Sequence, residues 1–244
     1  MRLTRCHVAQ PLRVGEEPVL PEHAAAHLSR VLRLRPGDRC VLFNGDGHDY
    51  AAQLLAVGKR ELRVRILERS AIDNESGLAI VLVQGIARGE KMDLVLQKAT
   101  ELGVAAIVPV AAERTEVRLD AERAEKRLAH WRSVVESACG QSGRARVPQV
   151  SAPARLDQAL AGLHGDGLRL VLDPAGEHRL ADLPRPASAR AWIAIGPEGG
   201  WSPADRGLLH AAGFSGLRLG PRVLRTETAG LAAIAALQSR FGDL

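Results

Sequence analysis

The sequence has 244 residues, 46% hydrophobic and 3% aromatic, which is enough for one large domain or two smaller ones with an aliphatic core. It contains no uncharged apolar run of about 18 residues and begins without the apolar segment of a signal peptide, which disfavours a membrane or secreted protein. Its three scattered cysteines, Cys6, Cys40 and Cys139, fit neither a disulfide framework nor a CxxC zinc site, so we expect a metal-free cytoplasmic protein.

The net charge of +5 is distributed unevenly along the chain. Residues 1–72 contain 12 Lys and Arg against 8 Asp and Glu, giving +4, whereas the remaining residues contain 21 against 20, giving +1. A basic module before a neutral one is typical of a polyanion-binding domain next to a catalytic domain. An ordinary solvated surface would explain an excess of four charges equally well.

The first part of the chain, residues 1–72, predicts a small domain rich in β-strands. The elements in chain order are a helix over 21–32, a turn at 36–38, a strand over 39–43, a turn at 44–47 and strands over 50–57 and 61–67. The last of these alternates charged and apolar residues, which is the period of a half-buried strand. A polar segment over 70–77 marks the expected domain boundary.

From residue 78 onward, buried strands alternate with helices. The predicted strands cover residues 78–83, 105–110, 168–172, 192–195 and 217–219. The predicted helices cover residues 91–102, 120–138, 203–212 and 226–240. This alternation predicts an α/β domain over residues 73–244 with a mainly parallel sheet.

Three of these strands end in loops rich in glycine and proline, after Leu172, Ile195 and Leu219. Ligands of open α/β sheets gather at the carboxyl ends of strands, so the loops predict a pocket made largely of main-chain groups. Structural turns are the alternative. The sequence has neither a GxGxxG after a strand nor a GxxxxGK[ST] motif, which disfavours a Rossmann dehydrogenase and a P-loop NTPase.

The chain resembles the RsmE family of 16S rRNA (uracil-N3)-methyltransferases, within the SPOUT class. The segments that carry the resemblance are 30–37 (RVLRLRPG), 88–93 (RGEKMD), 97–104 (QKATELGV), 113–114 (ER), 141–144 (QSGR), 147–148 (VP), 195–200 (IGPEGG) and 219–229 (LGPRVLRTETA). They run almost from end to end, and the last is the most specific.

The resemblance implies two domains and one reaction. Residues 1–72 would be a PUA-like β-barrel that binds RNA, and residues 73–244 a SPOUT domain whose C-terminal part forms a trefoil knot. Such enzymes work as homodimers with S-adenosylmethionine as cofactor. The substrate would be one uridine of 16S rRNA in the small ribosomal subunit, and the product N3-methyluridine.

By the same resemblance, the cofactor pocket would draw residues from all three loops. They are Leu172, Asp173, Pro174, Gly196, Glu198, Gly199, Gly200, Leu219, Gly220, Val223, Leu224 and Thr226. We expect many of these contacts to be made by the backbone. Thr226 also suits the N-cap of the last helix.

Two residues are candidates for catalysis. Uracil N3 is a poor nucleophile until its proton leaves, so the enzyme must accept that proton or stabilise the uracil anion. Glu198 could do the first, and Arg225, with its forked donors, the second. The alternatives are a loop carboxylate that accepts backbone hydrogen bonds for Glu198, and an ion pair with Glu227 or Glu198 for Arg225.

RNA contacts are expected from arginines. The candidates are Arg2, Arg5, Arg30, Arg33, Arg35 and Arg144. A surface ion pair is the alternative for Arg144. His23 and His27 have helical i, i+4 spacing but lack the Glu of a zincin motif, which disfavours a metal site. Trp201, beside the glycine-rich loop, is a packing residue or a platform for substrate.

Two other functions remain open at this point. One is ribose 2′-O methylation of RNA by another SPOUT enzyme, and the other is a non-catalytic RNA-binding protein that assists ribosome assembly. The basic first part and the context of Glu198 favour the base methyltransferase over the first. The intact glycine-rich loops favour it over the second.

Overall fold

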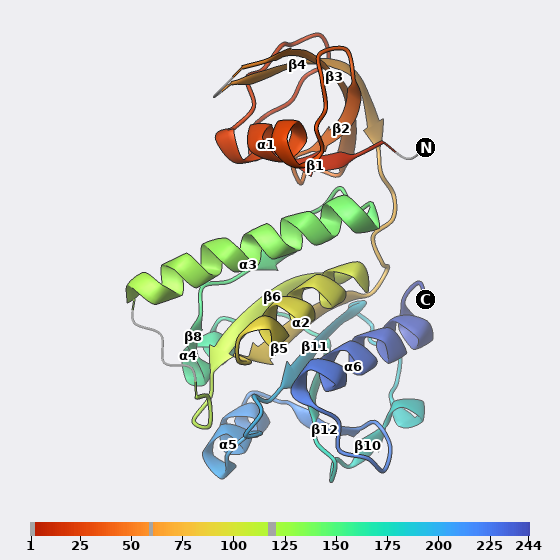
Figure 1. The fold of residues 1–244 in the computed structure, drawn as a ribbon. Helices are drawn as coiled ribbons and strands as arrows, with labels where there is room; N and C mark the ends of the chain where they lie inside the picture. Colours follow the sequence, from red (N-terminus) through yellow and green to blue (C-terminus); the bar gives the residue numbers. More distant parts are fainter. Residues whose placement is uncertain (1–2, 59–60, 117–120) are drawn as a thin grey trace. The chain divides into compact units, whose positions relative to one another are not determined.

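The computed structural model describes residues 3–58, 61–116 and 121–244, which form two compact units. The first unit runs to Glu75 and also includes Glu136–Val147. The second unit comprises Ser76–Val135 and Pro148–Leu244. Figure 1 shows the elements of both. The sequence pattern predicts contiguous domains and gives no sign that residues 136–147 group with the first unit.

The first unit is built on a four-stranded sheet in the order β1-β2-β3-β4. The strands are β1 (Arg5–His7), β2 (Arg39–Phe43), β3 (His48–Val57) and β4 (Leu62–Ala71). β1 runs parallel to β2, and the other pairs are antiparallel, so the predicted strands and hairpin are confirmed. β4 alternates buried and exposed residues from Leu62 to Ile66, and its buried side chains join the core of this unit.

The predicted helix over 21–32 is present in two pieces. α1 (Glu22–Ala26) continues as a π-helical turn, η1 (His27–Val31), in which the Leu32 N–H donates to the His27 carbonyl at 3.0 Å. The chain leaves this turn through Arg33, whose φ of 55° lies in the left-handed region. This backbone turn ends the helix and places the Arg33 side chain in solvent.

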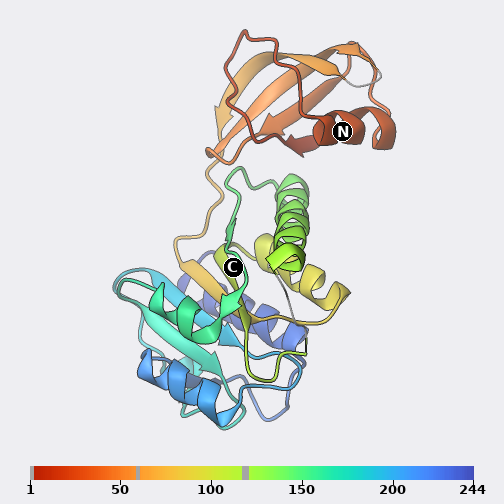
Figure 2. The same ribbon diagram turned by 90° about the vertical axis from the view of Figure 1, so that its left-hand side faces the viewer.

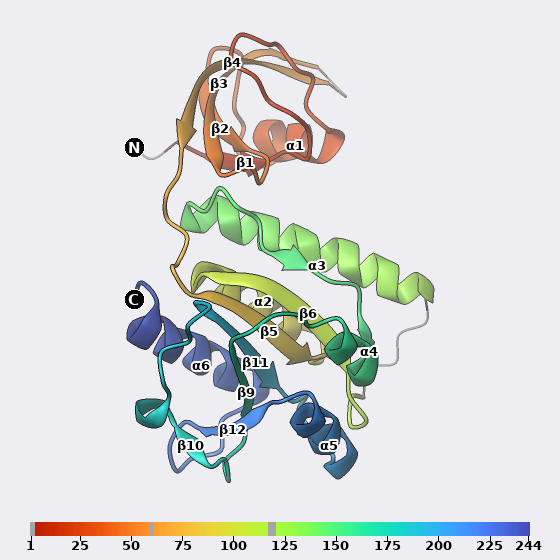
Figure 3. The same ribbon diagram turned by 180° about the vertical axis from the view of Figure 1, so that it is seen from behind.

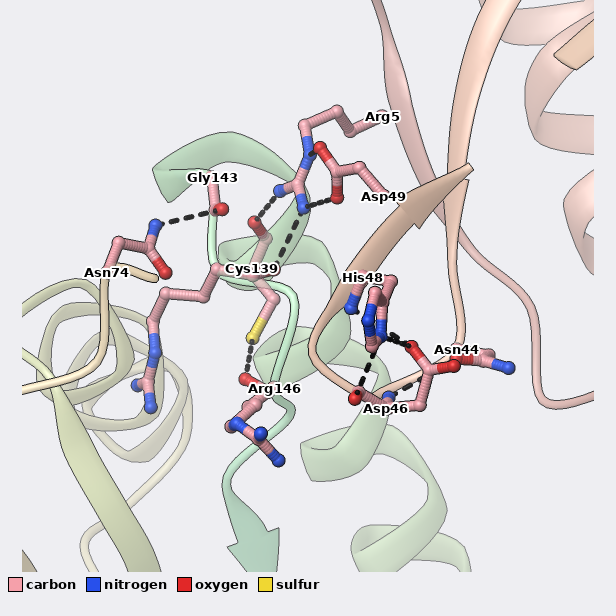
Figure 4. Close-up of polar contacts among 10 residues, drawn as sticks. Arg5, Asn44, Asp46, His48, Asp49, Asn74, Cys139, Gly143 and Arg146 are labelled. Carbon is pink, nitrogen blue, oxygen red and sulfur yellow. Dashed lines mark hydrogen bonds and ion pairs between the residues drawn. The ribbon is translucent and has the colours of Figure 1, made fainter. Parts of the chain in front are cut away.

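The last turns of α3 (Ala121–Ser142) and the loop after it belong to the first unit. Arg5 fastens them there, as Figure 4 shows: its Nη1 donates to the Cys139 carbonyl at 2.8 Å, while its Nε donates to Asp49 at 3.0 Å. Asn74 adds a bond of 3.0 Å to the Gly143 carbonyl. Sequence periodicity gives no sign of contacts between residues so far apart.

The second unit contains a sheet in the order β10-β12-β9-β11-β5-β6-β7, with β8 also paired to β6. Its strands are β5 (Ala79–Gly85), β6 (Val104–Ala111), β7 (Gln149–Val150), β8 (Ala154–Arg155), β9 (Leu168–Leu172), β10 (His178–Arg179), β11 (Arg190–Ile195) and β12 (Ser215–Arg218). Every pairing is parallel, so the predicted α/β domain with a parallel sheet is confirmed.

Helices cover both faces of this sheet, as the opposite views in Figures 1 and 3 and the side view in Figure 2 show. The helices that pack here are α2 (Glu90–Glu101), α4 (Leu156–Ala161), α5 (Pro203–Ala211) and α6 (Thr226–Phe241), with a short 3₁₀ turn, η2 (Leu180–Asp182). α2 and α6 lie on one face, and α4 and α5 on the other. The predicted helices are confirmed to within a few residues, whereas α4 and the two-residue strands were not predicted.

β11 lies in the middle of the sheet, between β9 and β5. Its residues from Ala191 to Ile195 are all buried, as expected for a parallel strand covered on both faces. Within the described ranges, no helix is long and apolar enough to cross a membrane, and no group of three or more His, Cys, Asp or Glu is arranged to hold a metal ion.

Candidate functional site

A cavity of about 640 Å³ lies at the carboxyl ends of β9, β11 and β12, which are neighbours in the sheet. All twelve residues expected to bind the cofactor line it, and so does Arg225. The other lining residues are Lys91, Arg114, Ile195, Pro197, Trp201, Arg206, Leu217, Arg222, Glu227 and Ala229. The cavity belongs entirely to the second unit.

The loop after β11 leaves little room for side chains at two of its glycines. A Cβ added to Gly196 would lie 3.2 Å from the Gly200 Cα, and one added to Gly199 would lie 3.0 Å from the Arg114 Cβ. Gly200 has a φ of 66°, and its N–H closes the turn on the Pro197 carbonyl at 2.8 Å. Glycine is therefore required here by close approach and by a positive φ, as a main-chain pocket needs.

Trp201, which follows this loop, is 4% exposed and packs in the core with Val83 and Leu209. It also lines the cavity, but its burial makes it part of the wall, so packing is its main role. Its Nε1 has no hydrogen-bond partner among the described residues.

Glu198 holds the glycine-rich loop to the segment before α2. Its Oε1 accepts hydrogen bonds from the Arg88 backbone N–H at 3.1 Å and from the Lys91 Nζ at 3.3 Å. Burial raises the pKa of Glu198, but these hydrogen bonds lower it by more, so the pKa lies below its usual value. Glu198 is thus an ionised carboxylate engaged by the backbone, which is the arrangement that the alternative interpretation described.

Arg225 and Arg222 are exposed residues that also line the cavity. Neither makes an ion pair within the described part of the chain. The ion pair of Arg225 with Glu227 or Glu198, considered from the sequence, is not found there. Two arginines without an ion pair among the described residues therefore line the cavity.

The remaining two carboxylates that line the cavity differ in their surroundings. Asp173 pairs with Arg206 and accepts a hydrogen bond from the Ala175 N–H at 2.9 Å. Glu227 lies in the first turn of α6, and its Oε2 is buried without a partner among the described residues. An unpartnered buried oxygen is costly. Glu227 is therefore a lining residue with one buried carboxylate oxygen that has no partner among the described residues.

The start of α6 corrects one expectation. Arg225, and not Thr226, is the N-cap, and no side chain caps the helix. The Thr226 hydroxyl instead donates to the Gly196 carbonyl at 2.6 Å and accepts from the Gln84 Nε2 at 3.1 Å. Because the hydroxyl is used in this way, it joins the helix to the glycine-rich loop.

The expected RNA contacts fall into three groups. Arg30, Arg33 and Arg35 are exposed in the first unit and free to meet a polyanion. Arg2 lies outside the described residues. Arg5 and Arg144, in contrast, each keep only 5% of their side chains exposed.

Arg5 and Arg144 make polar contacts within the protein. Arg5 pairs with Asp49 at 2.5 Å and also donates to the Arg144 carbonyl at 3.1 Å. Arg144 pairs with Glu75 at 2.5 Å in a partly buried ion pair, because Arg144 is 5% and Glu75 27% exposed. Figure 4 shows the Arg5 cluster. Formal charge alone cannot distinguish such buried cations from exposed ones.

Several residues of the site were not singled out from the sequence. Arg114 donates to the Gly199 carbonyl at 3.2 Å, and Gln84 reaches Thr226 from the end of β5. Gln84 could have been noticed in the sequence as the polar residue that directly follows the apolar run 78–83. Arg206 gave no sequence signal, because its partner Asp173 is 33 residues away.

Family models match both parts of the chain. A model described as an RNA methyltransferase domain matches residues 74–238. A model described as an RNA methyltransferase PUA domain matches residues 20–67. The two matches meet near the boundary expected from the sequence.

Relatives align with almost the whole chain. Ribosomal RNA small subunit methyltransferase E of Buchnera aphidicola subsp. Schizaphis graminum is 30% identical over 243 residues, covering 100% of this chain and 98% of that protein. The protein of the same name from Mycobacterium bovis is 34% identical over 234 residues, covering 93% and 89%.

Solved structures agree with this result. The Neisseria gonorrhoeae ribosomal RNA small subunit methyltransferase E, bound to S-adenosyl methionine, has a TM-score of 0.94 and 43% identity, with 99% of each chain covered. A Legionella pneumophila protein in complex with the bound cofactor SAM has a TM-score of 0.95 and 38% identity, with 100% of each chain covered.

Proposed function

We propose a methyl transfer to ribosomal RNA for this chain, because it belongs to the ribosomal RNA small subunit methyltransferase E family. S-adenosylmethionine is the methyl donor, and small-subunit rRNA is the acceptor. The observation that carries the proposal is that all twelve expected cofactor residues line one cavity. Relatives with 38% and 43% identity bind this cofactor.

The residues present fit such a cofactor. The cavity volume of about 640 Å³ lies within the usual range for small-molecule sites. Leucines 172, 219 and 224 supply apolar wall, and the glycine-rich loop lets backbone groups approach a ligand closely. When bound, S-adenosylmethionine supplies the methyl group as an electrophile on a positively charged sulfur.

The acceptor atom that we propose is N3 of one uridine in 16S rRNA. The N3–H bond must break while the electron pair remains on N3 to attack the methyl carbon. Arg225 lines the cavity without an ion pair among the described residues and would hold a uracil carbonyl, on which negative charge develops. Arg222 would assist it or hold a neighbouring phosphate.

A carboxylate would take the N3 proton. Glu198 is ionised and can accept one, but its lowered pKa makes it a weak base, and its Oε1 is already bonded to the loop before α2. Glu227 has a buried oxygen without a partner in the described part of the chain. We therefore test both residues, and expect Glu198 to contribute mainly by shaping the cavity.

Further features of the family pattern extend this proposal. The C-terminal segment would pass through a loop as a SPOUT trefoil knot, which is consistent with three distant loops lining one cavity. The first unit would be a PUA-like barrel that holds RNA, supported by the family match over 20–67 and by the exposed Arg30, Arg33 and Arg35. The protein would act as a cytoplasmic homodimer on the small ribosomal subunit.

The decisive experiment for the function is deletion of the gene followed by mass spectrometric mapping of small-subunit rRNA. We expect the loss of one N3-methyluridine, restored by the wild-type gene. Persistence of every N3-methyluridine would contradict the proposed base position. Loss of a ribose 2′-O-methyl group would support the rival reaction, and no lost methyl group would support a non-catalytic binder.

A second experiment tests the residues. Glu198→Ala, Glu227→Gln and Arg225→Ala are compared for cofactor affinity by calorimetry and for methylation rate at saturating cofactor. We expect Arg225→Ala and Glu227→Gln to lower the rate more than the affinity. A loss of affinity with an unchanged saturated rate would mean that the residue only binds.

A further inference from the structure

Gln84 is a buried amide behind the cofactor cavity. It is the sixth residue of β5, and its side chain is 0% exposed. Side chains alternate along a strand, so Gln84 shares its face with Leu82. A Cβ built on Gly230 of α6 would lie 3.6 Å from the Gln84 Oε1 and 3.8 Å from the Leu82 Cδ1, so this face is the one that meets α6.

The hydrogen bonds of Gln84 link three segments of the site. Its Nε2 donates to the Gly85 carbonyl at 2.9 Å and to the Thr226 Oγ1 at 3.1 Å. Thr226 in turn donates to the Gly196 carbonyl at 2.6 Å. The chain of bonds thus runs from the end of β5, through the first residue of α6, to the first residue of the glycine-rich loop.

The direction of each bond follows from its partners. The Gly196 carbonyl can only accept, so the single proton of the Thr226 hydroxyl must point at it. The hydroxyl can then only accept from Gln84, which requires the NH₂ end of the amide to face Thr226. The Gly85 carbonyl also requires the NH₂ end of the amide, because a carbonyl can only accept. One orientation of the Gln84 amide therefore satisfies both partners.

We propose that Gln84 is a positioning residue that fixes the Thr226 hydroxyl, and through it the alignment of the glycine-rich loop with the start of α6. The inference rests on the proposed function, because both segments line the cofactor cavity. Because the Thr226 Oγ1 accepts a hydrogen bond from Gln84, its O–H stays directed at the Gly196 carbonyl. Without Gln84, the hydroxyl can rotate and release the loop.

The other end of the amide argues against a role in stability alone. The Gln84 Oε1 is buried and has no hydrogen-bond partner among the described residues. Burying a polar atom without a partner costs free energy. Removing this oxygen recovers that cost and offsets the loss of the two hydrogen bonds made by Nε2, so an apolar side chain of similar shape should be tolerated here. Gln84 is thus a residue that the site needs and the core does not.

This contrast gives the test, in the full-length protein. Gln84→Met removes both hydrogen bonds and keeps a similar shape, and Gln97→Met on the exposed side of α2 is the matched control. We expect the dissociation constant for S-adenosylmethionine to rise about tenfold in Gln84→Met, which corresponds to about 1.4 kcal/mol, while Tm stays level or rises. Gln97→Met should change neither. Gln84→Leu repeats the test with a different packing shape.

A double mutant separates positioning from a general disturbance. Thr226→Val removes the same relay from the other side, so adding Gln84→Met to it should weaken cofactor binding no further.

Two results would overturn the inference: unchanged affinity in Gln84→Met, or a loss of affinity that merely follows a loss of Tm. If the wild type itself binds no S-adenosylmethionine, the proposed function fails instead.

Discussion

The buried Arg5–Asp49 ion pair gives the sharpest prediction for the first unit, since Arg5 was expected to contact RNA. Arg5 is 5% exposed and meets both Asp49 oxygens, at 2.5 and 3.0 Å, as well as two backbone carbonyls. In Arg5→Met, a carboxylate and two carbonyls would lose their partner. Breaking a buried pair costs about 3–5 kcal/mol. Because Asp49 keeps 19% of its side chain exposed, we expect the lower end, about 3 kcal/mol.

The assay can read this unit separately from the other. Tyr50 is the single tyrosine and is buried in the first unit, whereas Trp131, Trp192 and Trp201 all belong to the second. Urea unfolding followed by fluorine NMR of fluorotyrosine therefore reports the first unit, and tryptophan fluorescence reports the second. Arg5→Met should shift mainly the tyrosine transition.

Arg65→Met is the matched control for this prediction. Arg65 pairs with Glu17 at 2.6 Å, but the two side chains are 51% and 39% exposed, so its loss should cost about 0–1 kcal/mol. Equal effects of the two substitutions would refute the reasoning. So would an Arg5→Met protein that is fully stable but binds RNA with a smaller salt dependence, because that is the behaviour of a phosphate contact.

Three further predictions follow from single contacts. Gly85→Ala places a Cβ 2.5 Å from the Pro197 nitrogen. It should lower the free energy of unfolding by about 1–3 kcal/mol and weaken cofactor binding in calorimetry. The control Gly207→Ala, whose Cβ would meet nothing within 4 Å, should stabilise the protein slightly. The pKa of Glu198 is lowered in the folded state, so its ionised carboxylate stabilises the fold at pH values above its ordinary pKa of 4.5. This contribution is lost as the pH falls through the folded pKa. The Tm advantage of the wild type over Glu198→Gln should therefore shrink in acid, and a constant advantage would contradict it. Replacing Arg30, Arg33 and Arg35 together by Gln should reduce the slope of log K against log salt for RNA binding by about 2–3, and an unchanged slope would place the RNA elsewhere.

Local sequence patterns predicted most of the fold because the elements carry their own periodicity. The strand at 61–67 was visible from its alternation, and the buried strand β11 from its continuous apolar run. Short elements such as α4 and β10 escaped, since six or two residues hold too little pattern to be recognised. Their structure depends on neighbours that are distant in sequence.

The site was predictable to a different degree for backbone and for side chains. Glycine and proline at strand ends signal their own conformation, so the loops after β9 and β11 could be recognised as a pocket. The partners of charged side chains could not be. Nothing in the sequence distinguishes Arg5 and Arg144 from surface arginines. Their partner carboxylates, Asp49 and Glu75, are 44 and 69 residues away in the sequence.

The hydrogen-bonding state of the polar residues then distinguishes those that build the cavity from those that are free to act in it. Three lining residues have partners within the protein: Glu198, Asp173 and Thr226. These contacts hold their side chains in place, because moving one would break its hydrogen bonds or ion pair. Arg225 and Glu227 retain unused capacity in the described part of the chain. Uracil at N3 presents a donor between two acceptors, and the guanidinium of Arg225, which has no ion pair in the described part of the chain, complements such an acceptor. This complementarity moves the expected chemistry from Glu198 towards the first turn of α6.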